Sequence, residues 1–469
     1  MRYISTRGRS PEIGFREAVL SGLAPDGGLY MPVAWPVVPE GLQADFARMP
    51  FHEVASHILS YFAEPELTLD QLAPMSERAF AAFDTPVVAP LRRLDGDDYL
   101  LELFHGPTLA FKDIAMRMLA ELYDWALEGS ARGKTIIGAT SGDTGGAAIH
   151  AFAGSAKAEV FMLHPKGRVS DVQRRMMTTV GADNVVNIAV EGTFDDCQGL
   201  VKSLFADQRL NRALDLGGVN SINWVRLAVQ TVYYFTATAA LGEPASFVVP
   251  TGNFGDVFAG YAAKRMGLPI KRLGVAVNMN DIMKRALTTG VYKPSAAAPT
   301  SSPSMDIQVA SNFERLLFEA FNRDHAALSD LMAGFEREGA MTLPPETRAA
   351  IAADFCAENA SEAEVAEKIR SMQMNAGLLV DPHTAVGLVA LDKLRRGGKI
   401  TGRAICLATA HPAKFPEAVE RASSVHPALP ARYSGLMSAR EQMVAAPAEI
   451  GAIRAIIEER TRFAERNAR

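Results

Sequence analysis

Residues 106–113 read Gly106-Pro107-Thr108-Leu109-Ala110-Phe111-Lys112-Asp113. The stretch sets one lysine between a Gly-Pro turn and residues 114–120, whose apolar spacing predicts an amphipathic helix. A lysine packed under neighbouring Phe and Leu side chains loses much of its hydration, which disfavours the ammonium and leaves a neutral amine that attacks carbonyls. Lys112 is therefore a candidate for forming a Schiff base. The alternative is an ordinary first-turn lysine whose charge reaches solvent.

A strand, a tight loop and a helix are predicted within residues 135–148, TIIGATSGDTGGAA. The backbone N–H groups at such a helix start, together with the helix dipole, attract an anion. The loop has neither the Gly-x-Gly-x-x-Gly pattern nor a Gly-Lys-Ser/Thr ending, which excludes a dinucleotide or Walker-type site. A site for a carboxylate or phosphate remains, beside the alternative of a tight turn that binds nothing.

The same construction recurs at residues 247–260, where an apolar strand leads into Thr-Gly-Asn-Phe-Gly and a helix. A third strand and loop, residues 404–415, place the hydroxyl of Thr409 where it could bond a heterocycle nitrogen without carrying charge. One arrangement is consistent with these segments. A cofactor phosphate would bind in one loop and a substrate carboxylate in the other, with an aldehyde close to Lys112.

These motifs together resemble those of the threonine synthase family, in the branch with a long N-terminal extension. The resemblance covers nearly the whole chain. In chain order the matching segments are residues 3–8, 22–30, 106–113, 141–145, 220–224, 252–256 and 409–415.

The resemblance implies an α/β enzyme of fold type II, like the tryptophan synthase β chain, that uses pyridoxal 5'-phosphate. The implied reaction converts O-phospho-L-homoserine and water into L-threonine and phosphate, the last step of threonine biosynthesis, and makes the enzyme a carbon-oxygen lyase acting on phosphates. By motif, Lys112 would form the Schiff base with the cofactor and Thr409 would bond its pyridine nitrogen. The cofactor phosphate would be held at Gly252, Asn253, Phe254, Gly255 and Asp256, and the substrate carboxylate at Thr140, Ser141, Gly142 and Thr144.

Asp143, also expected beside the cofactor, departs from the wider fold pattern. A relative such as cysteine synthase carries Asn in this loop, whereas an ionised Asp only accepts hydrogen bonds. The sequence alone leaves the role of Asp143 open.

The leaving phosphate requires cations, and several residues compete for this role. Lys166 and Arg168 follow the predicted strand at residues 160–163, where open α/β sheets bind ligands. Asn223 with Arg226, and Arg315, are rivals. Each of these has an alternative interpretation as a surface charge or a helix cap.

Composition limits the classes of protein that remain. The 469 residues suffice for two or three domains. A net charge of −5 without a basic stripe argues against nucleic acid. The three cysteines form neither a disulfide framework nor a metal-ligand pattern, which suits a reducing cytoplasm. The chain starts without an apolar signal segment and has no apolar run of membrane length. We therefore expect a cytoplasmic enzyme, monomeric or homodimeric, that binds no metal.

The pattern of predicted elements divides the chain into four parts. Residues 1–91 form a helical and loop-rich extension that includes a predicted amphipathic helix at 51–59. Residues 133–214 form a small α/β unit, and residues 421–469 a helical tail. The large cofactor-binding α/β unit comprises residues 92–132 and 215–420, within which the Pro-, Ala- and Ser-rich segment 293–302 predicts a loop. Strands are predicted at residues 135–138, 160–163, 185–190, 247–249, 271–277 and 405–407, and we expect the ligand between the two units.

Two rival functions remain open at this stage. One is a serine or threonine dehydratase, or another β-replacement enzyme of the same fold, against which the N-terminal extension and the phosphate-directed cations argue. The other is a non-catalytic regulator that binds a phosphorylated metabolite, against which the intact Lys112 argues.

Overall fold

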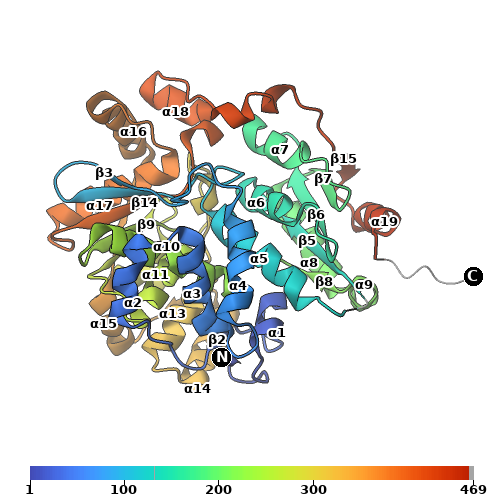
Figure 1. The fold of residues 1–469 in the computed structure, drawn as a ribbon, viewed down its shortest axis with the longest axis horizontal. Coiled ribbons are helices and arrows are strands. Elements are labelled where there is room, and N and C mark those ends of the chain that lie inside the picture. Colours follow the sequence, from blue (N-terminus) through green and yellow to red (C-terminus); the bar gives the residue numbers. More distant parts are fainter. Residues whose placement is uncertain (131, 464–469) are drawn as a thin grey trace, which may run out of the picture.

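The computed structural model describes residues 1–130 and 132–463 as an α/β fold with two large sheets (Figure 1). The larger sheet is parallel except for one edge strand, and its order is β13 (Phe355–Asn359), β10 (Leu273–Val277), β9 (Ser246–Pro250), β14 (Ala404–Ala408), β4 (Asp98–Glu102) and β3 (Leu91–Arg93). The smaller sheet is wholly parallel, in the order β15 (Val444–Pro447), β7 (Val185–Glu191), β6 (Ala158–Pro165), β5 (Lys134–Ala139) and β8 (Leu216–Gly217). The two sheets lie on opposite sides of the molecule in Figure 1.

Every strand predicted from the sequence is present, and the boundaries differ by at most two residues at each end. Each consists mainly of apolar side chains and is largely buried, as parallel sheets between helices require. Among the strands of the two large sheets, those not predicted from the sequence are β3, β4, β8, β13 and β15. β3, β8, β13 and β15 lie at sheet edges, and β4, with the sequence DYLLE, has a charged residue at each end and so lacks a run of strong strand-forming residues. The short strands β1 (Tyr3–Ser5), β2 (Tyr30–Pro32), β11 (Val291–Tyr292) and β12 (Met341–Thr342) lie outside these sheets and were not predicted either.

Helices flank both sheets. Those of the smaller sheet are α6 (Asp143–Phe152), α7 (Asp171–Thr178), α8 (Phe194–Ala206), α9 (Gln208–Leu214) and α19 (Ile450–Arg460). Those around the larger sheet are α5 (Lys112–Ala126), α10 (Trp224–Leu241), α11 (Gly255–Arg265), α12 (Ile282–Thr289), α13 (Phe313–Ala320), α14 (His325–Glu338), α15 (Pro345–Asp354), α16 (Glu362–Ala376), α17 (Pro382–Arg396) and α18 (Pro416–Ser423).

The N-terminal extension is joined to the main body by a continuous apolar core. It contains the antiparallel pair β1 (Tyr3–Ser5) and β2 (Tyr30–Pro32), and the helices α1 (Phe15–Leu20), α2 (Glu40–Asp45), α3 (Phe51–Ala63) and α4 (Leu69–Phe80). The predicted amphipathic helix is α3, which packs on α10, while α4 packs on α5. The extension therefore buries helices that would otherwise expose apolar faces.

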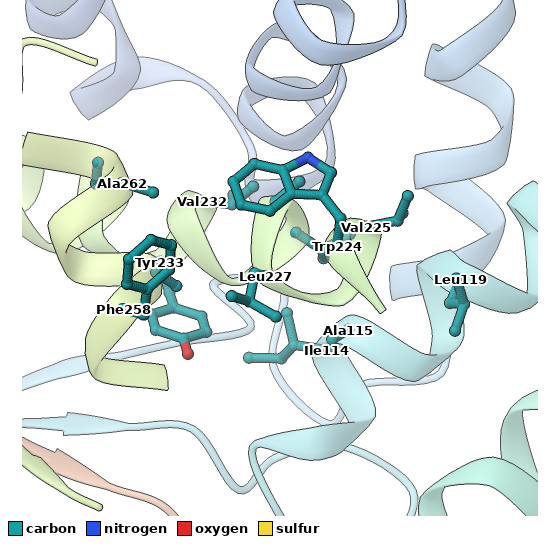
Figure 2. Close-up of a cluster of buried hydrophobic side chains, with 14 of the residues drawn as sticks. Ile114, Ala115, Leu119, Trp224, Val225, Leu227, Val232, Tyr233, Phe258 and Ala262 are labelled. Carbon is teal, nitrogen blue, oxygen red and sulfur yellow. The ribbon is translucent and has the colours of Figure 1, made fainter. Parts of the chain in front are cut away.

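Helix α10 is the centre of this core. Most of its 18 residues are buried, which explains why apolar residues occur around its whole circumference, with Arg226 and Gln230 among the polar exceptions. Figure 2 shows side chains of α5, α10 and α11 converging, among them Leu119, Trp224 and Phe258. This packing fixes the positions of two helices, α5 and α11, whose N-termini face the cavity described below.

The segment after α18 crosses from the larger to the smaller sheet, where β15 pairs with β7. β8, at residues 216–217, also joins the smaller sheet through β5. The smaller sheet thus draws on residues outside the predicted small unit, and the division of the chain into domains stays a prediction. Within the described residues, no helix combines the length and apolarity that crossing a membrane requires.

We expect Leu119→Ala to lower the free energy of unfolding by about 2–5 kcal/mol, because the side chain is fully buried and its loss leaves a cavity that the helices cannot close. Urea denaturation followed by circular dichroism measures the effect. Met374→Ala is the control, since Met374 on α16 is 76% exposed, and its change should stay within about 0.5 kcal/mol. Equal effects of the two substitutions would contradict the assignment of the core.

Candidate active site

The turn before Lys112 is held against the end of β14 by two backbone hydrogen bonds. The N–H of Phe111 donates to the carbonyl of Thr409 at 2.9 Å, and the N–H of His411 donates to the carbonyl of Leu109 at 3.0 Å. Leu109 adopts the left-handed conformation, with φ of 56°, so that the chain can turn directly into α5. These contacts bring Lys112 and Thr409 to the wall of one cavity of about 970 Å³.

Lys112, the first residue of α5, is largely buried. Its Nζ lies 3.3 Å from Oδ2 of Asp143 and 3.4 Å from Oγ of Ser304. Burial lowers the pKa of Lys112; Asp143 opposes this effect, while Lys414 and Arg226 reinforce it. Relative to a lysine in water, the site therefore shifts Lys112 toward the neutral amine, the form that reacts with an aldehyde.

Asp143 begins α6 and accepts hydrogen bonds from four side chains. Oδ1 faces Nε2 of Gln173 at 2.8 Å and Nζ of Lys414 at 2.7 Å, while Oδ2 faces Lys112 and Oγ of Ser304, the latter at 3.0 Å. Burial alone would raise the pKa of Asp143, but the ammonium groups of Lys112 and Lys414 outweigh it and hold that pKa well below its usual range. Asp143 is thus an ionised counterion, a role that an Asn could not fill.

The loop before α6 presents free backbone donors. The hydroxyl of Thr140 accepts the N–H groups of Gly142 and Gly145, both at 2.9 Å, and so closes the loop on itself. Within the part of the chain that the structure describes, the N–H groups of Ser141, Asp143 and Thr144 have no acceptor. They lie at the positive end of α6, as binding of an anion requires.

The loop before α11 is built in the same way. Phe254 is left-handed, with φ of 64°, and the N–H groups of Gly252, Asn253 and Gly255 have no acceptor among the described residues. A Cβ at Gly252 would lie 2.6 Å from the carbonyl oxygen of Ser304, so only glycine fits. This loop also lines the cavity, which is therefore reached by two helix N-termini with free N–H groups, one following a strand of each large sheet.

Asp256, predicted to bind the cofactor, is buried in the first turn of α11. Its Oδ1 accepts hydrogen bonds from the hydroxyls of Tyr233 and Tyr234, and its Oδ2 has no partner among the described residues. Burial raises the pKa of Asp256 to about 7. A carboxyl that is readily protonated is compatible with an anion bound at the adjacent loop.

Five predicted substrate-binding residues, Gly142 and four polar or charged residues, are absent from the described residues that line the cavity. Lys166 and Arg168 are exposed, and Lys166 pairs with Glu191 at 2.9 Å. Asn223 caps α10, and its amide donates to two backbone carbonyls of the N-terminal extension. Arg315 is fully buried and donates to the carbonyls of Tyr30 and Ile222, so its guanidinium joins the extension to the core.

Arg226, a rival cation in the sequence analysis, does line the cavity. It is 3% exposed, and burial lowers its pKa to about 10. One of its terminal nitrogens donates to the carbonyl of Val219, while its Nε has no partner within the described chain. A buried guanidinium with spare donors facing a cavity is suited to bind an anion.

The sequence analysis assigned no role to three polar residues beside Lys112. Ser304 lies just after the predicted loop at 293–302, in the short 3₁₀ helix η2 (Pro303–Met305), and no local pattern indicated it. His383 accepts a hydrogen bond from the N–H of Ser304 at 3.3 Å and itself contacts Asp381. Lys414 lies within the predicted motif at residues 409–415, yet its contact with Asp143 depends on the tertiary fold.

Comparisons with known protein families cover most of the chain. Residues 2–80 match the family described as threonine synthase N terminus, residues 80–354 the pyridoxal-phosphate dependent enzymes, and residues 384–457 the threonine synthase C-terminal family. A threonine synthase of Pseudomonas aeruginosa is 43% identical over 461 residues, which are 97% of this chain and 98% of that protein.

Solved structures agree with these matches. The crystal structure of PLP-bound threonine synthase from Brucella melitensis superposes with a TM-score of 0.96 at 47% identity, covering 98% of this chain and 100% of that one. Threonine synthase from yeast gives a TM-score of 0.93 at 37% identity, covering 98% of both chains.

We expect Asp256→Asn to change how stability depends on pH. The carboxyl of Asp256 has a pKa of about 7 in the folded protein and of about 4 in an unfolded chain, so the stability that it contributes is lost as pH rises from 4 to 7. Relative to the wild type, the variant should therefore gain about 2 kcal/mol between pH 5 and pH 7. Thermal unfolding of both proteins across this range measures the difference, and parallel curves would contradict the raised pKa.

Proposed function

This chain belongs to the threonine synthase family, and from that premise we propose that the cavity around Lys112 is its active site. The protein is a pyridoxal-phosphate-dependent lyase of fold type II that converts O-phospho-L-homoserine and water into L-threonine and phosphate. One observation supports the placement above all: a buried lysine with a lowered pKa faces a cavity lined by two anion-binding loops.

In our proposal the residues of the larger sheet hold the cofactor, which supplies the electron sink for the reaction. The free N–H groups of Gly252, Asn253 and Gly255 bind its phosphate at the positive end of α11. Lys112 would hold the cofactor through its Nζ, and the uncharged hydroxyl of Thr409 would form a hydrogen bond with the ring nitrogen. The hydrogen bond between Phe111 and Thr409 supports this arrangement, because it sets both contacts in one rigid unit.

The loop of the smaller sheet takes the substrate carboxylate in this proposal. Ser141 and Thr144 line the cavity, and their N–H groups are free to donate to an anion. Thr140 and Gly142 shape the loop rather than touch the ligand, since the hydroxyl of Thr140 already accepts the N–H of Gly142. The carboxylate would thereby hold the reacting carbon atoms close to Lys112.

Lys112 would also serve as the base of the reaction. As a neutral amine it would take the proton from Cα and return protons to the substrate carbons, so that the phosphate at Cγ could leave and water could add at Cβ. Asp143 and Ser304 keep Nζ in place during these transfers, because both contact it in the free protein.

Arg226 is the cation that we propose for the substrate phosphate. It is buried, faces the cavity and has an unpaired Nε among the described atoms. The corresponding roles of Lys166, Arg168, Asn223 and Arg315 stay predictions, and their contacts elsewhere in the fold favour Arg226 over them.

We place this activity in the cytoplasm, in a monomer or homodimer that binds no nucleic acid. The modest net charge of −5 and three buried cysteines without disulfide bonds support that setting.

A serine or threonine dehydratase is the nearest alternative. The two activities differ in the leaving group, so release of inorganic phosphate from O-phospho-L-homoserine, with formation of threonine, separates them. Production of a 2-oxo acid from serine without phosphate release would favour the dehydratase.

We expect Lys112→Ala to abolish the visible absorbance that borohydride removes from the wild-type protein with pyridoxal phosphate. Phosphate release should fall by about 10³-fold or more, because the variant lacks both the amine that binds the cofactor and the base. Lys399→Ala, at an exposed lysine, is the control and should retain both signals. An unchanged spectrum of Lys112→Ala would refute the assignment.

We expect Arg226→Gln to raise KM for O-phospho-L-homoserine by about 10- to 100-fold, since a hydrogen bond to a charged group contributes about 1.5–3 kcal/mol. Inhibition by added inorganic phosphate should weaken in parallel, while the cofactor spectrum is retained. Arg272→Gln is the matched control, because Arg272 lies outside the cavity lining and donates to the carbonyl of Phe355. A KM equal to that of the wild type would assign the phosphate to another cation.

A further inference from the structure

Lys414 is a buried ammonium whose position on the fold is fixed by two acceptors. It ends the short 3₁₀ helix η3 (Pro412–Lys414), directly after the loop that carries Thr409, and it is 1% exposed. Its Nζ donates to the carbonyl of Thr108 at 2.6 Å and contacts Oδ1 of Asp143 at 2.7 Å. A charge so completely removed from water persists only with such partners.

The carboxylate that pairs with Lys414 is the one that pairs with Lys112. Oδ1 of Asp143 faces Lys414, whereas Oδ2 faces Lys112 at 3.3 Å. Gln173 and Ser304 donate to the same two oxygens, so the carboxylate keeps four donors around it. Two cations thus share one largely buried anion.

We propose that Lys414 is a positioning residue for the reaction: its fixed ammonium offsets the charge of Asp143 and so keeps the nitrogen of Lys112 able to release its proton. The inference rests on the proposed function of Lys112. It assigns to Lys414 an action through Asp143, without contact between Lys414 and the substrate.

Lys414 acts through the net charge that Lys112 experiences. With Lys414 present, one negative charge is shared between two positive charges, and a proton on Lys112 is held weakly. Without the ammonium of Lys414, Asp143 attracts that proton alone. The other titratable or charged groups that interact with this cluster come from α5, α6, α10 and α17, and they are Asp113, His150, Arg226 and His383.

If Lys414 only supported the structure, its substitution would have a different effect. Its bond to the carbonyl of Thr108 also supports the turn before Lys112, where the N–H and hydroxyl of Thr108 donate to Asp113. A residue that only supports this turn would affect stability and leave the proton equilibrium of Lys112 unchanged. Lys414→Gln separates the two roles, because it removes the charge and keeps an uncharged N–H donor on a side chain shorter by one atom.

The experiment measures the pH at the midpoint of the absorbance change of the bound cofactor, in the full-length protein with pyridoxal phosphate and without substrate. We expect Lys414→Gln to raise this midpoint by about one pH unit or more, as loss of a nearby buried charge does. Lys414→Arg should stay close to the wild type because it keeps the charge. Asp143→Asn should lower the midpoint, and the double variant Asp143→Asn/Lys414→Gln should lie between the two single variants.

A folded Lys414→Gln protein with the wild-type midpoint would overturn the inference. If that variant does not fold, the double variant replaces it, because removing both charges avoids leaving one buried and unpaired. In that case an identical midpoint for the double variant and Asp143→Asn would overturn the inference instead. A wild-type protein that gives no cofactor absorbance at all would refute the proposed function itself, which is a distinguishable result.

Discussion

The short backbone bridge between Ala110 and Ala410 is the contact on which the geometry of the site depends. The bridge forms because the segments that contain Ala110 and Ala410 follow two adjacent parallel strands, β4 and β14. These strands end side by side, with Glu102 of β4 opposite Ala408 of β14. The sheet register therefore sets the distance between Lys112 and Thr409, and a reactive amine is held by hydrogen bonds between residues far apart in the chain. Rigid placement of this kind removes much of the entropy cost of bringing reacting groups together.

The electrostatics of the site come from the same architecture. In each large sheet a central parallel strand ends at the cavity and a helix begins there, so α6 and α11 both direct free N–H groups at it. Against these partial positive charges and the buried cations, Asp143 is the ionised carboxylate at Lys112, and its low pKa follows from the two lysines beside it. Attraction for anionic ligands and activation of a lysine are therefore properties of one charge arrangement.

The sequence predicted those parts of the site that depend on residues close together in the chain. Glycine-rich turns after apolar strands indicated both anion-binding loops, and the Gly-Pro turn before a helix indicated Lys112. Ser304, His383 and Lys414 could not be assigned in this way, because their roles depend on contacts with residues distant in the chain. The sequence did contain an indication of the role of Asn223. An Asn before an apolar helical run is typical of a helix cap, and Asn223 caps α10.

The pairing of β15 with β7 has a consequence for biosynthesis of the protein. The smaller sheet gains its edge strand from residues 444–447, which pair with residues 188–191. On a ribosome these partners emerge roughly 250 residues apart, a delay on the order of 10–50 seconds at about 5–20 residues per second. During that interval β7 is an unprotected edge open to pairing with other chains. Synthesis of residues 444–447 is thus the step that covers this edge, and a nascent chain arrested before it would expose a strand prone to aggregation.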